Sequence, residues 1–417
     1  MTTLRARLLY PVASPVVEDG MVCVADGAIR SWGRWDGRPA EDLGNVILMP
    51  GLINAHCHLD YSVMRGAILP CASFTRWIRR INDLKRTLDD DDWLASVAAG
   101  FRELQSSGTT SVFNIEAFPD LMPLMPAPPI RTWWFLEMID LRHPVEPEEV
   151  VARARTFFAE RPEWIGGIGL SPHAPYTASP DLCSRSARCC EAHALPLTTH
   201  IAESDEESEM FLDASGRLHE FFSAIGRDMS DTGGISPVAR MLCDGGLPDG
   251  ALLAHMNRIE DSDWPLLRGR KFSVIHCPLC HEYFGRPPFP LDRFLAEGIN
   301  ICLGTDSLAS NRELNLFAEI RRLLETHPHV APESAIRFVT TNPARAIGWA
   351  GRLGEVSAGA AADLIAIPYS GPAEAAAEAV TRHSGPVAWT MVAGRRLPAV
   401  TQETWGQCAY SCTFKNI

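Results

Sequence analysis

The chain has 417 residues, of which 46% are hydrophobic and 21% are charged, a composition that is ordinary for a globular protein in water. The formal net charge of −13 argues against a nucleic-acid partner, because a phosphate backbone is bound by a basic surface. No apolar stretch reaches the roughly 18 residues that a membrane span needs, and no secretory signal is apparent. We therefore expect a cytoplasmic protein with no membrane partner, folded as one large barrel or as two domains.

The two ends of the chain share one pattern. Residues 1–50 contain short alternating runs, with hairpin-type turn signals at residues 16–20 and 26–27. Similar short runs return at residues 354–356, 362–367 and 388–394. We predict that residues 1–50 and 352–417 combine into one small β-sandwich domain.

Residues 51–351 alternate between apolar runs and helical patterns, which is typical of βα units around a parallel sheet. Helices are predicted over residues 74–86, 91–106 and 147–160. Eight strands are predicted: the run before His56, then residues 110–114, 132–136, 165–170, 197–200, 251–255, 272–276 and 299–304. Eight such units predict an α/β fold with a closed (β/α)8 TIM-like barrel.

Side chains that can bind a metal follow six of these eight strands, at the carboxyl ends where barrels place their reactive groups. Residues i and i+2 of a strand point the same way, so the imidazoles of His56 and His58 face one side. The other strand-end residues are His173, His200, His255, His276, His281 and Asp306. One such histidine is usually a loop residue that makes a hydrogen bond, but their joint placement favours a transition-metal site.

These segments resemble the metal-dependent amidohydrolase superfamily, in its deaminase and chlorohydrolase branch. The matching segments are residues 50–58, 171–176, 200–203, 254–255, 276–278 and 304–306. The resemblance runs from about residue 20 to about residue 395. It implies four metal ligands, His56, His58, His200 and Asp306. It also implies that Glu203 and His255 act on the water and the substrate, and that His173 contacts the substrate.

The number of metal ions follows from a missing residue type. Some members of that superfamily hold two metals bridged by a carboxylated lysine. This chain has no lysine from Arg86 through Arg270, so that subtype is not expected. One divalent ion, zinc ahead of iron or manganese, is the better interpretation, and a bridge by another residue type stays open.

The chemistry can also be argued from the residue types. A metal bound by three imidazoles and a carboxylate lowers the pKa of a bound water towards 7. Asp306 can bind that metal and accept the proton of the water, while His255 holds the nucleophile in line. Glu203 follows His200 by three residues and can protonate a ring nitrogen and then the departing amine. Taken alone, Glu203 would be a solvated carboxylate at an acidic helix start.

Within the branch, the chain most resembles aminodeoxyfutalosine deaminase-like proteins. The shared segments are residues 54–62, 74–78, 276–278, 281–285 and 304–311. One departure is Leu279-Cys280, where relatives often carry Arg-Ser; if that arginine contacts the substrate, this chain acts on another compound. We expect His281 to reach the substrate edge and Trp77 to stack on the substrate, with helix packing as the alternative for Trp77.

Two cysteines open a different interpretation. Cys277 and Cys280 form a Cys-x-x-Cys pair, which would suit a zinc ribbon or a redox site, but the sequence contains no second pair of this spacing. The twelve cysteines are scattered, and a disulfide framework is typical of small secreted domains. We expect reduced, mostly buried thiols.

The sequence therefore predicts a hydrolase of carbon–nitrogen bonds other than peptide bonds, which deaminates an aminated heterocycle such as a purine nucleoside-like compound. Two alternatives remain: a related hydrolase that displaces chloride or a substituted amine, and a non-catalytic ligand-binding barrel. The second predicts loss of the proton-transfer carboxylates, whereas Glu203 and Asp306 are both present. The expected partner is a small molecule, and a homo-oligomer is left open.

Overall fold

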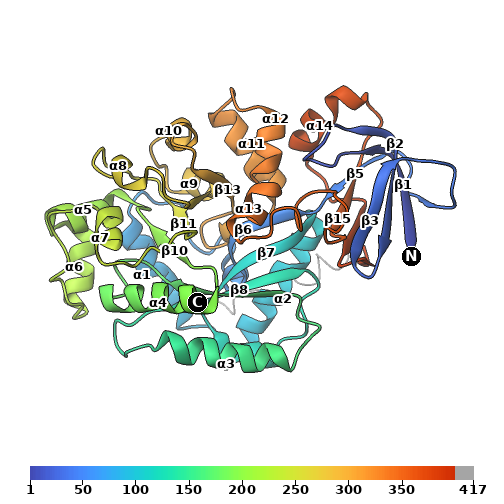
Figure 1. Cartoon of the computed structure of the whole chain (residues 1–417). Coiled ribbons are helices and arrows are strands. Elements are labelled where there is room, and N and C mark those ends of the chain that lie inside the picture. Colours follow the sequence, from blue (N-terminus) through green and yellow to red (C-terminus); the bar gives the residue numbers. More distant parts are fainter. Residues whose placement is uncertain (400–417) are drawn as a thin grey trace.

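The computed structural model describes residues 1–399 and has an α/β architecture. Its strands form one mixed sheet of eight strands and two parallel sheets of five and four strands. In Figure 1 the mixed sheet lies at the right, and the parallel strands with their helices lie to its left. Within residues 1–399, no helix combines the length and the apolar character needed to cross a bilayer.

The mixed sheet joins segments from both ends of the chain. Its strands are β1 (Thr2–Leu9), β2 (Val17–Ala25), β3 (Ala28–Arg34), β4 (Glu41–Asp42), β5 (Val46–Pro50), β15 (Leu364–Pro368), β16 (Trp389–Val392) and β17 (Arg395–Arg396). Their order is β17-β16-β15-β5-β1-β2-β3, with β4 on β1, and β5 pairs with β15 from Val46↔Pro368 to Pro50↔Leu364. Leu4, Ala6 and Leu364 belong to its buried core. The predicted pairing of the two ends is confirmed, the second sheet of the sandwich stays a prediction, and residues 400–417 of that predicted domain lie outside the described residues.

The two parallel sheets contain the eight strands that the sequence predicts. The five-stranded sheet has the order β14 (Asp306–Ser307), β6 (Leu52–His58), β7 (Thr109–Glu116), β8 (Arg131–Met138) and β9 (Gly166–Pro172). The four-stranded sheet has the order β10 (Thr198–Ile201), β11 (Leu252–His255), β12 (Ser273–His276) and β13 (Asn300–Leu303). Every residue of β6 and β7 is buried, as expected for parallel strands that are covered on both faces.

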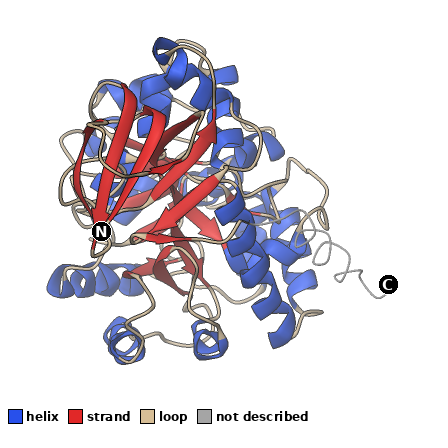
Figure 2. Cartoon of the chain, turned by 90° about the vertical axis from the view of Figure 1, so that its right-hand side faces the viewer, coloured by secondary structure: helices blue, strands red, loops and turns tan. Residues whose placement is uncertain are grey.

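Helices follow most of the parallel strands (Figure 2). They are α1 (Phe74–Lys85), α2 (Asp90–Ser106), α3 (Pro147–Ala159), α4 (Pro180–His193), α5 (Asp205–Asp213), α6 (Gly216–Ala224), α7 (Pro237–Cys243), α8 (Trp264–Leu267), α9 (Pro278–Tyr283), α10 (Leu291–Ala296), α11 (Leu316–Thr326), α12 (Pro332–Arg337), α13 (Thr341–Ala346) and α14 (Ala376–Arg382), with 3₁₀ turns at Leu59–Met64, Pro119–Leu124 and Ala373–Ala375. Asp89 caps α2 in a capping box with Asp92, and Ser204 caps α5. The three predicted helices are confirmed as α1, α2 and α3.

Two contacts bring the edges of the parallel sheets towards each other. An isolated parallel bridge joins Leu170 of β9 to Leu197, just before β10. At the other side β14 follows β13 directly and pairs with β6. Gly304 lies between β13 and β14, and a Cβ there would come within 2.8 Å of His56. Only glycine fits this approach, which brings Asp306 beside the end of β6.

Candidate active site

The carboxyl ends of the parallel strands open into one cavity of about 540 Å³. Seven of the residues singled out in the sequence line it: His58, Trp77, His173, His200, Glu203, His255 and Asp306. His56 is fully buried and contacts His58, His200 and His255 through its ring. Most of the strand-end side chains that the sequence singles out therefore meet at one place, whereas His276 and His281 are not among the described residues that line the cavity.

Three imidazoles converge at the base of this cavity. Nε2 of His58 lies 3.1 Å from Nε2 of His200, and the ring centroids of His56 and His200 are 4.8 Å apart. Within residues 1–399, neither ring nitrogen of His56 has a hydrogen-bond partner, nor does Nδ1 of His58. Burial lowers the pKa of His58 and of His200 well below the ordinary value, so both rings are neutral. Buried ring nitrogens without partners are costly unless they bind an ion, so this donor set fits a divalent transition metal.

Asp306 adds a carboxylate to the imidazoles. Its Oδ1 lies 3.6 Å from Nε2 of His56 and 3.7 Å from Nε2 of His58. Burial alone raises the pKa of Asp306, but the neighbouring His56 and His255 outweigh it, so the pKa lies well below the ordinary aspartate value. His56, His58 and His200 form one group that could hold a metal, and His56, His255 and Asp306 form another. The carboxylate is therefore ionised and available as a ligand or as a proton acceptor.

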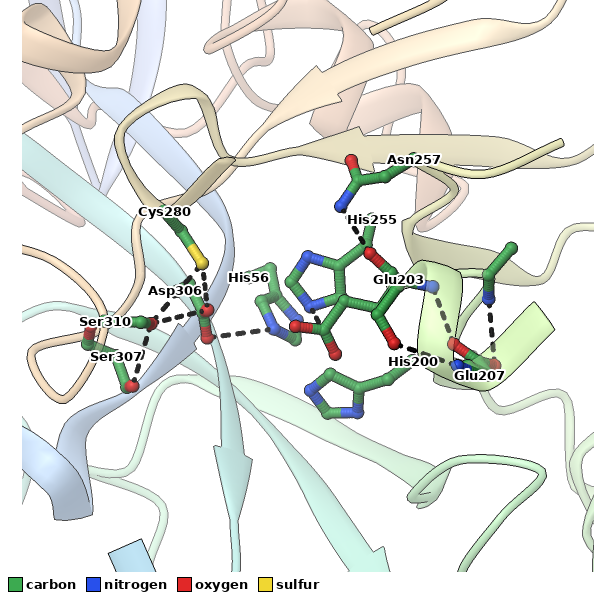
Figure 3. Close-up of polar contacts among 12 residues, drawn as sticks. His56, His200, Glu203, Glu207, His255, Asn257, Cys280, Asp306, Ser307 and Ser310 are labelled. Carbon is green, nitrogen blue, oxygen red and sulfur yellow. Dashed lines mark hydrogen bonds and ion pairs between the residues drawn. The ribbon is translucent and has the colours of Figure 1, made fainter. Parts of the chain in front are cut away.

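The other oxygen of Asp306, Oδ2, accepts two hydrogen bonds on the side away from the imidazoles (Figure 3). Oδ2 accepts a hydrogen bond from Sγ of Cys280 at 2.8 Å and one from Oγ of Ser310 at 2.9 Å. Burial and the charge of Asp306 raise the pKa of the Cys280 thiol well above its ordinary value, so the sulfur keeps its proton. The sequence singles out Cys280 in a Cys-x-x-Cys pair and as a departure from related proteins, but it indicates no contact of Cys280 or Ser310 with Asp306.

Glu203 is placed on the opposite side of the imidazoles, just after β10. Its side chain is 7% exposed, and Oε2 lies 3.8 Å from Nε2 of His255. Burial raises the pKa of Glu203 well above the ordinary glutamate value, against the opposing charge of Arg286. Burial also lowers the pKa of His255 to about 3. Burial thus favours the protonated form of Glu203 and keeps the imidazole of His255 neutral, which suits a general acid beside a hydrogen-bonding base.

The backbone around Glu203 is fixed by side chains that sequence reasoning missed (Figure 3). The carboxylate of Glu207 accepts hydrogen bonds from the N–H groups of Ala202 at 3.0 Å and Glu203 at 2.7 Å. Nδ2 of Asn257 donates to the carbonyl oxygen of Glu203 at 3.1 Å. Glu207 stands in an acidic helix start that is typical of solvated residues, and only its i+4 spacing from Glu203 could have indicated its role.

The three residues predicted to contact substrate occupy different places. His173 lines the cavity, and its Nδ1 lies 2.6 Å from Oγ1 of Thr177. Trp77 lines the cavity on α1, where its indole N–H donates to the carbonyl oxygen of Ala309 at 3.2 Å. His281 is not among the described residues that line the cavity: its ring contacts Oδ1 of Asn257 at 3.1 Å and the carbonyl oxygen of Pro287 at 2.7 Å. Its substrate contact stays a prediction.

Two further carboxyl groups are buried near the carboxyl ends of β6 and β7. Asp60 is 1% exposed, and Glu116 ends β7 and is fully buried. Glu116 accepts hydrogen bonds from the N–H of Phe118 at 3.0 Å and from Nδ2 of Asn114 at 3.2 Å. Burial raises the pKa of Glu116 to about 7. In the unfolded chain the same group titrates near about 4.3.

This difference makes the stability of the protein depend on pH. The contribution of Glu116 is fully present below its unfolded pKa and is lost as the pH rises through about 7, because the unfolded chain then binds fewer protons. Between pH 6 and pH 8 we expect Glu116 to remove about 1 kcal/mol from the free energy of unfolding. The measurement is urea denaturation of zinc-saturated protein at both pH values. Between pH 6 and pH 8, the free energy of unfolding should fall less for Glu116→Gln than for the wild type.

The readout is the change between the two pH values, since the amide of Glu116→Gln cannot accept both hydrogen bonds and lowers stability at every pH. Glu209→Gln, an exposed position of α5, serves as the control and should keep the wild-type pH dependence. If the free energy of unfolding falls equally in Glu116→Gln and in the wild type between the two pH values, the prediction is wrong.

Comparison with known proteins adds independent findings. The family model described as "Amidohydrolase family" matches residues 47–397. A 5-methylthioadenosine/S-adenosylhomocysteine deaminase of Syntrophobacter fumaroxidans is 29% identical over 85% of this chain and 81% of its own length. An aminodeoxyfutalosine deaminase of Deinococcus radiodurans is 28% identical over 83% of this chain and 85% of its own length.

Solved structures share the fold. The Helicobacter pylori aminofutalosine deaminase, in complex with methylthio-coformycin, superposes with a TM-score of 0.83 at 21% identity, over 95% of this chain and all of that chain. An adenosine deaminase from Xanthomonas campestris with bound zinc gives a TM-score of 0.82 at 21% identity, over 99% of this chain and 96% of that chain. At this identity the likeness concerns the fold alone.

Proposed function

The chain belongs to the amidohydrolase family, and we propose that it is an aminohydrolase that replaces the exocyclic amine of a purine nucleoside-like compound with oxygen from water, releasing ammonia. One observation carries this proposal: Glu203, whose pKa is raised by burial, shares a cavity with His58, His200 and an ionised Asp306. Relatives named as deaminases of 5-methylthioadenosine, S-adenosylhomocysteine and aminodeoxyfutalosine support the substrate class. The enzyme is thus a hydrolase of carbon–nitrogen bonds other than peptide bonds.

We propose that His56, His58, His200 and Asp306 hold one divalent ion, zinc ahead of iron or manganese. Neutral buried imidazoles and an ionised carboxylate are the donors that zinc prefers, and a related fold has been crystallised with zinc. When bound, such an ion lowers the pKa of a water molecule towards 7 and supplies a nucleophile at neutral pH.

The remaining steps fall to the side chains of the chain itself. Asp306 is ionised and accepts a proton from the attacking water at a carboxylate oxygen. Glu203 donates its proton to a ring nitrogen of the substrate, which makes the ring carbon more electrophilic. Its carboxylate then takes the proton of the added hydroxyl group and passes it to the leaving amine, and the proton held by Asp306 restores the acid form of Glu203. The neutral ring of His255 orients the water. His173 and Trp77 line the same cavity and bind the substrate ring.

We also propose a division of the chain into two domains. Residues 51–351 would form one closed (β/α)8 barrel, and residues 1–50 and 352–417 a composite β domain. The bridge between Leu170 and Leu197 and the pairing of β14 with β6 support closure of the barrel. The ten cysteines of residues 1–399 are free thiols, which supports a cytoplasmic location.

A screen for ammonia release tests the function. Zinc-loaded protein is incubated with 5-methylthioadenosine, S-adenosylhomocysteine, aminodeoxyfutalosine, adenosine, guanine and aminopyrimidines, with a chlorinated aminotriazine as the comparison substrate. We expect ammonia in equal amount to the deaminated product from at least one adenine nucleoside. Chloride release without ammonia would favour the chlorohydrolase alternative. A zinc-loaded protein that converts none of these compounds would contradict the proposal.

A further inference from the structure

We propose that Cys280 is a positioning residue for Asp306: its thiol donates a hydrogen bond that fixes the carboxylate with Oδ1 towards the imidazoles. This inference rests on the proposed function, because it assigns the thiol a part in preparing the metal site. It concerns the position where the sequence departs from the Arg-Ser of related proteins. A residue that acts through another one should affect metal binding and turnover without touching the substrate.

The geometry around the carboxylate supports this role (Figure 3). Cys280 is 2% exposed, and its Sγ lies 2.8 Å from Oδ2 of Asp306 and 3.4 Å from Oγ of Ser310. Oγ of Ser310 also donates to Oδ2. Two donors on Oδ2 hold the carboxylate in one rotamer, with Oδ1 3.6 Å from Nε2 of His56.

The thiol is held in place by a buried glutamate. Cys280 lies on the short helix α9, and the N–H of the preceding Leu279 donates to Oε2 of Glu319 at 2.8 Å. The other oxygen of Glu319 accepts from Nδ2 of Asn311 at 2.7 Å, and Asn311 also donates to the carbonyl oxygen of Thr305 at 2.7 Å. Glu319 therefore links the start of α9 to the segment that carries Asp306. This network fixes the thiol and its acceptor relative to each other.

Cys280 is placed behind the metal ligands. Of the described residues, the two buried groups that could hold an ion comprise His56, His58, His200, His255 and Asp306, and neither includes Cys280. The sulfur contacts the oxygen of Asp306 that is turned away from His56. Partners that hydrogen-bond to a ligating group typically change metal affinity or activity by about 10–100-fold when removed. A thiol is a weak donor, so we expect an effect near the lower end of that range.

Three variants test the inference. Cys280→Ala removes the donor, Cys280→Ser keeps a donor of similar size, and Cys183→Ala removes another buried thiol, on α4, as the control. Zinc affinity is measured by competition with a chromogenic chelator, and kcat and KM are measured on the best nucleoside of the screen. We expect Cys280→Ala to lower zinc affinity and kcat by about 10-fold each without changing KM. Cys280→Ser should regain most of both losses, and Cys183→Ala should match the wild type.

Wild-type zinc affinity and kcat in Cys280→Ala would overturn the inference. So would a Cys280→Ser variant as impaired as Cys280→Ala, because the thiol would then act through packing. Failure of the proposed function has a different signature: the zinc-loaded wild type would release no ammonia from any nucleoside, while the zinc affinities of the variants could still be ranked. A wild-type protein that binds no zinc would overturn both proposals.

Discussion

Glu203→Gln is expected to lower kcat by about 10²–10⁴-fold, because the amide keeps the shape of the carboxyl group but cannot deliver its proton. The wild-type side chain lines the cavity and is buried, which raises the pKa of its carboxyl group and favours the protonated form that the reaction needs. The variant should still bind about one zinc ion per chain, since Glu203 is not in either buried group of metal-competent residues within residues 1–399. Steady-state kinetics and elemental analysis of the same preparation measure both quantities.

The control is Glu209→Gln, which makes the same change on the exposed side of α5. It should retain wild-type kcat and zinc content. Full activity in Glu203→Gln would remove the proton-transfer role from this residue. Loss of zinc together with activity would instead assign Glu203 to the metal site.

Removal of the metal is expected to lower both the activity and the stability of the protein. Dialysis against a strong chelator should lower kcat by more than about 10³-fold, since the ion contributes several kcal/mol to stabilising the transition state. The buried nitrogens of His56 and His58 then lose the ion that offsets their desolvation, so the free energy of unfolding should fall as well. With zinc at about 100 times its Kd, the linked stabilisation is about 2.7 kcal/mol. Activity assays and urea denaturation before and after zinc addition measure both effects.

Two variants make this experiment specific. The first variant is His58→Ala, which removes a buried imidazole of the cavity. Adding zinc should not restore the activity or the stability of this variant. His329→Ala should behave as the wild type, because His329 is an exposed residue paired with Asp292. Full activity of chelated protein without measurable metal would contradict a metal-dependent reaction.

The sequence predicted the parts of this molecule that depend on local periodicity. Strand alternation places His56 and His58 on one side, and the βα pattern predicts eight parallel strands whose carboxyl ends meet. The convergence of His58, His200 and Asp306 in one cavity, with His56 in contact with the rings of His58 and His200, followed from that topology. These inferences need only the direction in which each strand points.

The roles that the sequence did not reveal depend on side-chain contacts that no periodic pattern indicates. Cys280 and Ser310 meet at Asp306 from separate segments, and nothing in their own neighbourhoods indicates that meeting. Glu207 stands among acidic residues that would be solvated on most helices, yet it is buried beneath the backbone of Glu203. Such roles depend on how side chains pack in three dimensions. Because these contacts follow no periodic pattern, they cannot be inferred from a single sequence.

The pairing of β5 with β15 bears on how the protein is made. During translation β5 is synthesised early. Its antiparallel partner β15 is synthesised only after the whole region that carries the metal ligands. One edge of the amino-terminal sheet therefore stays open during translation, and open edges invite pairing with other nascent chains. We expect β15 to close this edge once it has been synthesised, so it protects the enzyme from aggregation, although none of the described residues of β15, β16 or β17 lines the cavity.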